Sequence, residues 1–113
     1  MNMAVGTLDG GVTCIRLQGR LDTPGAGAID LKFTSHVAAG EHGVVVDLSG
    51  VVYIASMGLR LLFAAARDLQ RRGRVLVLFG ASSQVQQVLD EAAIDQVIPI
   101  VATEAEALAR LAA

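Results

Sequence analysis

The sequence predicts an α/β fold: a small sandwich with a mixed, mostly parallel sheet of about five strands, about four helices and an antiparallel N-terminal edge strand. Short β-rich runs alternate with helical patterns along the chain, and strand–helix–strand connections place neighbouring strands parallel. The first two runs are instead joined by Asp9-Gly10, which is a strong hairpin signal. With 113 residues, 53% of them hydrophobic, the chain can bury an ordinary core without disulfide or metal cross-links.

The first half of the chain contains a predicted hairpin followed by a helix. Residues 3–8 and 12–18 are β-rich and flank Asp9-Gly10-Gly11, so we expect two antiparallel strands there. Thr23 and Pro24 are typical of an N-cap and a first helical residue. The helix that follows would end near residue 40 and would carry its apolar residues on one face: Ile29, Phe33 and Val37.

The second half alternates strands with helices. Residues 43–48 form a nearly continuous apolar run, typical of a strand covered on both faces, and the run continues at residues 51–54. A helix is predicted from about residue 56 to residue 72, with three arginines away from its apolar stripe. These arginines are Arg60, Arg67 and Arg71. The remaining predicted elements are a strand at 74–79, a helix opened by Ser83 and Gln86, a strand at 96–101, and a final helix opened by Thr103 and Glu106.

Composition excludes several classes of protein. The high apolar content argues against intrinsic disorder, and nine basic residues against eleven acidic ones give no attraction for nucleic acid. A single cysteine, Cys14, cannot form an internal disulfide, which argues against a disulfide-rich secreted protein. The N-terminal residues lack a signal-peptide pattern, and no apolar stretch approaches the length that membrane insertion needs. We therefore expect a soluble cytoplasmic domain.

No motif for catalysis, metal binding or cofactor binding is evident. His36 and His42 are far from Cys14 in the sequence and do not form a convergent ligand set. Gly25-Ala26-Gly27 lacks the third glycine of a dinucleotide-binding loop, and the sequence has neither a nucleophile elbow nor a Walker loop. The sequence thus predicts no enzyme, no metal, no cofactor and no small-molecule substrate.

Polar residues follow two predicted strands, at the carboxyl ends where α/β sheets usually hold their functional sites. Asp22 comes after the second strand, and Ser56 opens the second helix. Ser56 could be a plain N-cap or a phosphorylation site, since a helix N-terminus favours an anion. Asp47 could be compared with the phosphoacceptor of response-regulator receivers. Because the only lysine is Lys32 and no acidic pair is present, we expect Asp47 to bond the following turn.

Two segments resemble the STAS domain family, specifically its bacterial anti-sigma-factor antagonist branch. They are Gly19-Arg20-Leu21-Asp22 and residues 44–62, VVVDLSGVVYIASMGLRLL. The resemblance in length and element order extends over the whole chain, implying a single STAS domain over residues 1–113. In that branch a hydroxyl residue is phosphorylated by a partner that is both serine kinase and anti-sigma factor, and a PP2C-type phosphatase removes the phosphate. The unmodified antagonist binds the kinase and frees the sigma factor.

Carried over to this sequence, the resemblance implies that Ser56 is the phosphoacceptor and that Asp22 is the acidic residue near it. The sequence departs from the family motif at two positions, because Ala55 replaces the motif's aspartate and Met57 replaces its second hydroxyl residue. The predicted partner-binding surface consists of Asp22, Ala55, Ser56, Met57, Gly58 and Arg60. The alternative function is a constitutive STAS binding module, or a subunit of a transport or signalling complex, in which Ser56 is not phosphorylated.

Overall fold

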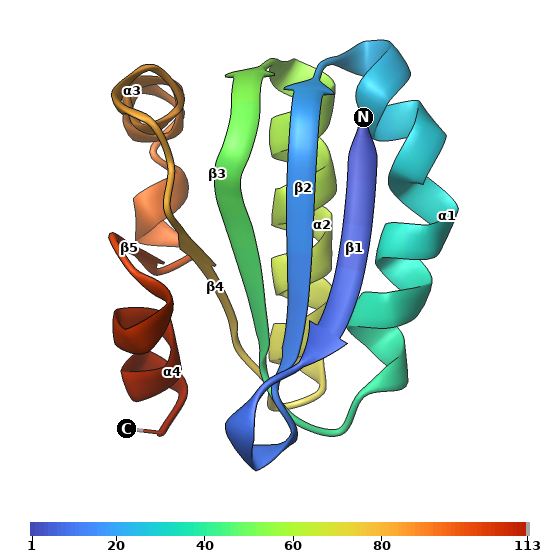
Figure 1. The fold of residues 1–113 in the computed structure, drawn as a ribbon, viewed down its shortest axis with the longest axis vertical. Helices are drawn as coiled ribbons and strands as arrows, with labels where there is room; N and C mark the ends of the chain where they lie inside the picture. Colours follow the sequence, from blue (N-terminus) through green and yellow to red (C-terminus); the bar gives the residue numbers. More distant parts are fainter. Residues whose placement is uncertain (113) are drawn as a thin grey trace.

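A computed structural model describes residues 1–112, in which one sheet of five strands packs against four helices (Figure 1). The strands are β1 Asn2–Thr7, β2 Thr13–Leu21, β3 Val44–Ile54, β4 Leu76–Phe79 and β5 Ile100–Val101, and they lie side by side in that order. The helices are α1 Thr23–Ala39, α2 Ser56–Arg71, α3 Ser83–Glu91 and α4 Glu104–Ala112. Short 3-10 turns cover Asp9–Gly11 and Ile94–Gln96.

Strand pairing confirms the predicted α/β class and the antiparallel edge. β1 runs antiparallel to β2, with Val5 opposite Ile15, and each of the other neighbouring pairs is parallel. Gly10 and Gly11 in the hairpin connection have φ angles of 79° and 77°. Because side chains disfavour this left-handed region, the paired glycines are what allow the chain to reverse so tightly.

The last strand lies where it was predicted but is much shorter. Of residues 96–101, only Ile100–Val101 form β5, while Ile98 is fully buried in the core. Pro99 has no N–H to donate to a ladder, and its carbonyl accepts a hydrogen bond from the Leu78 N–H at 3.0 Å. Pairing with β4 therefore begins at the Pro99 carbonyl, and β5 itself starts at Ile100. β4 is also shorter than predicted: the strand expected over residues 74–79 begins at Leu76.

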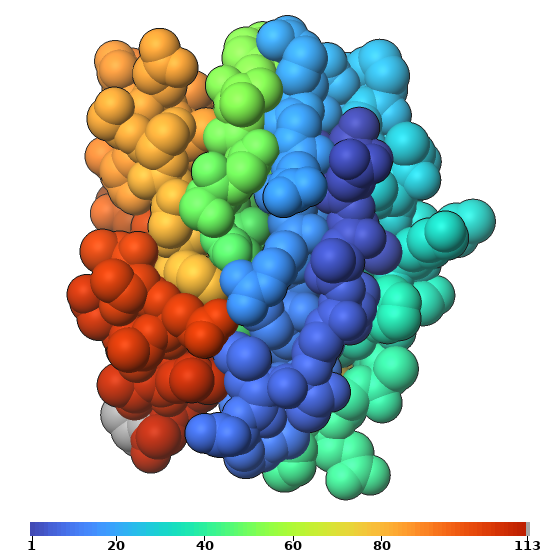
Figure 2. Space-filling model, in the orientation of Figure 1, coloured from blue at the N-terminus to red at the C-terminus, as the bar shows by residue number. Residues whose placement is uncertain are grey.

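A separate hydrophobic core lies on each face of the sheet. The larger core contains fully buried side chains from three helices, such as Phe33 of α1, Leu62 of α2 and Leu89 of α3. The smaller core includes Cys14 and Val45 from the sheet, which pack with Ala107 of α4. In Figure 2 the residues of α4 cover the lower left of the molecule, and β2 and β3 stay visible above them.

The upper half of that second face is open. Val52 is 64% exposed and Tyr53 is 42% exposed, although the apolar run suggested a strand covered on both faces. The physical reason is the length of α4, since its nine residues span roughly 14 Å and pack only against the lower end of the sheet. Exposed side chains of the carboxyl-terminal halves of β2 and β3 are therefore available on this face.

Helix α3 begins one residue earlier than predicted. Its N-cap is Ser82, whose backbone is extended and whose hydroxyl accepts a hydrogen bond from the Val85 N–H at 3.2 Å. Ser83 is therefore the first helical residue and does not cap the helix. Thr103 does cap α4 as predicted, because its Oγ1 accepts a hydrogen bond from the Glu106 N–H at 3.2 Å.

Candidate functional site

Parallel pairing of β2 with β3 brings the two polar segments of the sequence together. Leu21 at the end of β2 lies opposite Ile54 at the end of β3, and the Ala55 N–H donates to the Leu21 carbonyl at 3.1 Å. Asp22 follows Leu21 directly, and Ser56 follows Ile54 after one intervening residue, Ala55. Both therefore lie at the same carboxyl edge of the sheet, where the first residues of α1 and α2 meet, as the sequence predicted.

Asp22 is the N-cap of α1, so the expectation that Thr23 has this role is wrong. The backbone of Asp22 is extended, and its carboxylate accepts a hydrogen bond from the Gly25 N–H at 2.9 Å. The Arg20 Nε donates to the same carboxylate at 3.2 Å. The bond from Gly25, assisted by Arg20, holds the pKa of Asp22 below its usual value. The side chain is thus an ionised carboxylate that is fixed by Gly25 and Arg20 at the same edge of the sheet as Ser56.

Ser56 is the first residue of α2 and is exposed. Ala55 occupies the N-cap position and supplies no side-chain hydrogen bond, so the interpretation of Ser56 as an N-cap is wrong. The first N–H groups of a helix lack intrahelical partners and attract negative charge. Ser56 therefore presents its hydroxyl to solvent at a helix terminus that would tolerate an added anion.

Gly58 holds the start of α2 against the end of β2. It is buried, and a Cβ at this position would overlap the Leu21 carbonyl oxygen and lie 2.7 Å from the Leu21 Cγ. No side chain can be accommodated there without moving the helix. Gly58 is buried in the first turn of α2, so its part in the predicted partner-binding surface would be to position Ser56 and the exposed residues around it.

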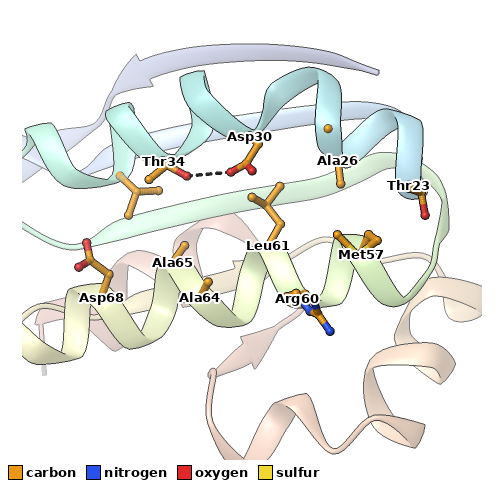
Figure 3. A pocket seen from close by; sticks show the side chains of 12 residues that line it. Thr23, Ala26, Asp30, Thr34, Met57, Arg60, Leu61, Ala64, Ala65 and Asp68 are labelled. Carbon is orange, nitrogen blue, oxygen red and sulfur yellow. Dashed lines mark hydrogen bonds between the residues drawn. The ribbon is translucent and has the colours of Figure 1, made fainter.

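Met57 and Arg60 line a groove of about 400 Å³ between α1 and α2. Figure 3 shows Met57 beside Thr23 at one end of the groove, whereas Arg60 points away from α1. Met57 is 39% exposed, so a part of its thioether side chain is accessible next to Ser56. Of the six predicted surface residues, Ala55 and Asp22 are half-buried, Ser56, Met57 and Arg60 are exposed, and Gly58 is covered.

Tyr53 is a residue of this edge that the sequence argument did not select. The Arg20 guanidinium carbon lies 4.3 Å from the centroid of the Tyr53 ring, a cation–π contact. The same guanidinium bonds Asp22, so the ring and the carboxylate together fix Arg20. Only the pairing of Arg20 with Tyr53 in the β2–β3 register reveals this contact.

Comparison with known proteins decides the family. The STAS domain profile matches residues 6–107. The chain belongs to the STAS domain family. A protein of Bordetella bronchiseptica described as an anti-sigma factor antagonist, BtrV, is 30% identical over 100 residues, which cover 88% of this chain and 85% of that protein.

Solved structures agree with the assignment of this STAS domain. An anti-sigma-factor antagonist domain protein from Planctomyces limnophilus superposes with a TM-score of 0.89 and is 26% identical, covering 98% of each chain. The phosphorylated form of SpoIIAA from Bacillus has a TM-score of 0.71 at 21% identity and covers 96% of this chain and 98% of that one. At that identity the likeness to SpoIIAA concerns the fold alone.

Asp47 of this STAS domain is a structural residue, as predicted. Its Oδ1 accepts a hydrogen bond from the Ser49 N–H at 2.9 Å, and its Oδ2 lies 2.7 Å from Arg16 Nη1. Burial by itself raises the pKa of Asp47, but the hydrogen bonds from Ser49 and Arg16 outweigh burial and lower it. Arg16 also bonds Glu104 at 3.0 Å and thereby ties α4 to the sheet.

The described part of this STAS domain contains neither a metal-ligand cluster nor a helix that could cross a bilayer. Among residues 1–112, no three His, Cys, Asp or Glu side chains are grouped so that they could hold a metal ion. Within the same residues, every helix is too short or too polar for a membrane span. The site at the edge of the sheet thus consists of one exposed hydroxyl, one fixed carboxylate and the side chains around them.

Proposed function

We propose that this STAS domain is an anti-sigma factor antagonist of a partner-switching pathway, in which unphosphorylated Ser56 marks the binding-competent form. Its partner would be an anti-sigma factor with serine-kinase activity, and a PP2C-type phosphatase would reverse the modification. Similarity to anti-sigma factor antagonists supports the general role. The supporting observation in the structure is that Ser56 is exposed at the first position of α2, at the same edge of the sheet as the Asp22 cap of α1.

Phosphorylation would act on the surface without unfolding the domain. The Ser56 Oγ would take the γ-phosphoryl group of ATP and lose its proton, with ADP as the other product; the phosphatase would return the hydroxyl and release inorganic phosphate. The added group carries about two negative charges at neutral pH. The helix N-terminus stabilises these charges, whereas a bound partner would meet both the charge and the bulk of the phosphate. The expected outcome is release of the partner from an intact fold.

Intact-mass measurement tests the proposed acceptor. The protein is incubated with its cognate kinase and ATP, and wild type is compared with Ser56→Ala and Ser83→Ala. Ser83 is a matched control because it is also an exposed first residue of a helix. We expect one phosphoryl group on wild type and on Ser83→Ala, and none on Ser56→Ala. Wild type that gains no phosphate would rule out the switch, and equal gain by Ser56→Ala would move the site elsewhere.

The second candidate function is a constitutive binding module or a subunit of a transport or signalling complex. The observation that favours it is the absence of the family's motif aspartate and second hydroxyl residue, which Ala55 and Met57 replace. Partner affinity of the Ser56→Glu variant separates the two functions. A constitutive module keeps its affinity, whereas the switch predicts a loss of at least about tenfold, since a charge in a docking face of this kind costs on the order of 1–2 kcal/mol.

The proposal extends to location and chemistry. We expect the protein to act in the cytoplasm, as one STAS domain over residues 1–113. We expect it to have no catalytic activity of its own. Detectable turnover of any substrate by the purified protein would contradict the non-enzymatic part of the proposal.

A further inference from the structure

Helix α2 has an exposed stripe of residues that begins at Ser56. Its members recur at intervals of three or four residues and lie within a sector of roughly 80° around the helix axis. All of them are exposed. We call the four residues after Ser56 the α2 basic stripe: Arg60, Phe63, Arg67 and Arg71.

The arginines of this stripe lack acidic partners. Among residues 1–112, salt bridges occupy Arg16, Arg20 and Arg72, and none involves an arginine of the α2 basic stripe. Arg72 is at the same end of α2 but pairs with Asp68 on another side of the helix, at 3.3 Å. Guanidinium groups that no carboxylate of residues 1–112 neutralises therefore recur along the stripe, and their positive charge is available to an incoming partner.

Phe63 lies within the stripe and is 39% exposed. The Arg67 guanidinium carbon is 5.8 Å from the centroid of its ring, so the ring rather than a carboxylate holds this arginine. An exposed aromatic ring between arginines has the composition of a protein-binding hot spot. The chain as a whole has nine basic and eleven acidic residues. The positive charge of α2 is therefore a local feature of this surface and does not follow from the overall composition.

We propose that the α2 basic stripe is a docking surface for an acidic face of the partner protein. The partner would offer carboxylates to the arginines and a shallow apolar site to Phe63. The inference rests on the proposed function in one respect, namely that the domain has a protein partner. It adds the chemistry of that partner and extends the contact surface from Ser56 along the whole exposed length of α2.

The position of Ser56 at the head of the stripe gives phosphorylation a direct effect on docking. Arg60 lies four residues after Ser56, so the two side chains are neighbours on the helix surface. A phosphate on Ser56 would pair with Arg60 and compete with the partner's carboxylates for it. The same phosphate would also repel the acidic face of the partner, so both effects favour release.

A protein face suits the stripe better than a lipid surface. Helices that lie in a membrane interface insert a broad apolar face. The apolar face of α2 is buried in the core through Leu62, Ala66 and Leu69, which leaves Phe63 as the large apolar side chain of the stripe. A single ring would insert too little apolar area for stable membrane binding, whereas one ring among arginines is sufficient for a protein contact.

Association kinetics with the cognate anti-sigma factor test the inference. Rates are measured for wild type, for Arg67→Glu/Arg71→Glu and for the control Lys32→Glu/Arg110→Glu, which has the same net charge and changes exposed residues of α1 and α4. We expect the stripe variant to associate at least about tenfold more slowly and the control to stay within about twofold of wild type. Raising the salt from about 0.05 M to about 0.5 M should slow wild type much more than the stripe variant. Arg67→Gln/Arg71→Gln repeats the comparison should the reversed charges disturb folding, which a melting curve reports.

Each outcome decides a separate point. Wild type that binds at a rate that neither the stripe variants nor salt alters would overturn the inference and leave the proposed function in place. Wild type that does not bind the anti-sigma factor at all would overturn both. Sedimentation with equimolar phosphatidylglycerol and phosphatidylcholine vesicles is the third arm. Wild type that sediments with them while Arg67→Glu/Arg71→Glu does not would assign the stripe to a membrane and overturn the protein-docking inference.

Discussion

Replacing Gly58 with alanine should destabilise the protein even though alanine is the better helix former. Gly58 lies in the first turn of α2, where its backbone touches the end of β2. An added methyl group would overlap the Leu21 carbonyl oxygen and approach the Ile54 Cγ1 to 3.2 Å. Because a paired backbone carbonyl cannot rotate away as a flexible side chain can, α2 must shift instead.

The size of the effect follows from two opposing contributions. Alanine in place of glycine stabilises a helix by about 1 kcal/mol. Overpacking of a tight site costs about 1–3 kcal/mol, and a backbone neighbour places this site near the upper limit. The expected net change in the free energy of unfolding is a loss of roughly 1–2 kcal/mol. For a domain of this size, that lowers the melting temperature by about 4–8 °C.

Thermal denaturation followed by circular dichroism measures this loss, and Gly27→Ala is the matched control. Gly27 is an exposed glycine of α1, and a Cβ there would meet nothing within 4 Å. The control should therefore gain about 0.5–1 kcal/mol from helix propensity alone. Gly58→Ala that melts at or above the wild-type temperature would refute the argument that this glycine is required by the contact between α2 and β2.

Two further predictions concern charged side chains outside the docking face. Asp47→Asn should lower the free energy of unfolding by about 1 kcal/mol at neutral pH, because the ion pair with Arg16 is lost. The lowered pKa of Asp47 means that its carboxylate stabilises the fold above the unfolded-state pKa of about 4, and that this contribution disappears as pH falls through the folded-state pKa. Urea titrations should accordingly show the two proteins converging at acidic pH, and a constant difference down to pH 2 would contradict the assignment. Arg74→Ala should cost about 1–2 kcal/mol, because the Arg74 guanidinium donates to the carbonyl of Val37 in the last turn of α1 and to that of His42 in the loop after it. Arg110→Ala, which removes an exposed arginine of α4, should leave the urea midpoint unchanged.

The strand and helix order was predictable because it depends on local patterns. The apolar run at residues 43–48 is typical of a covered strand, and residues 44–48 are buried in the structure. The hairpin was also predictable from neighbouring residues. Its turn needs a left-handed backbone conformation, which favours glycine, and Asp9-Gly10 supplies that glycine. Their positions after predicted strands likewise placed Asp22 and Ser56 at one edge of the sheet.

Helix starts were less predictable because a cap is decided by the backbone angles of a single residue. The expected caps Thr23 and Ser83 each lie one residue after the true cap, and Ser56 likewise lies one residue after the N-cap position. In each case the expected residue has the chemistry of a cap but already belongs to the helix. For Ser56 this difference matters, since its hydroxyl is not used to cap α2.

The sequence by itself determined the fold class and the family, and it singled out the hydroxyl that we propose as the switch, because each is encoded by neighbouring residues. Only the tertiary structure showed that Gly58 is covered, that Arg20 is held by the Tyr53 ring, and that the arginines of α2 have no acidic partner among residues 1–112. Each of these facts depends on which side chains from distant segments meet. Arg16 illustrates this, since it bonds Glu104, which is 88 residues away in the chain. Such contacts are fixed by strand register and helix packing, and residue spacing alone does not specify them.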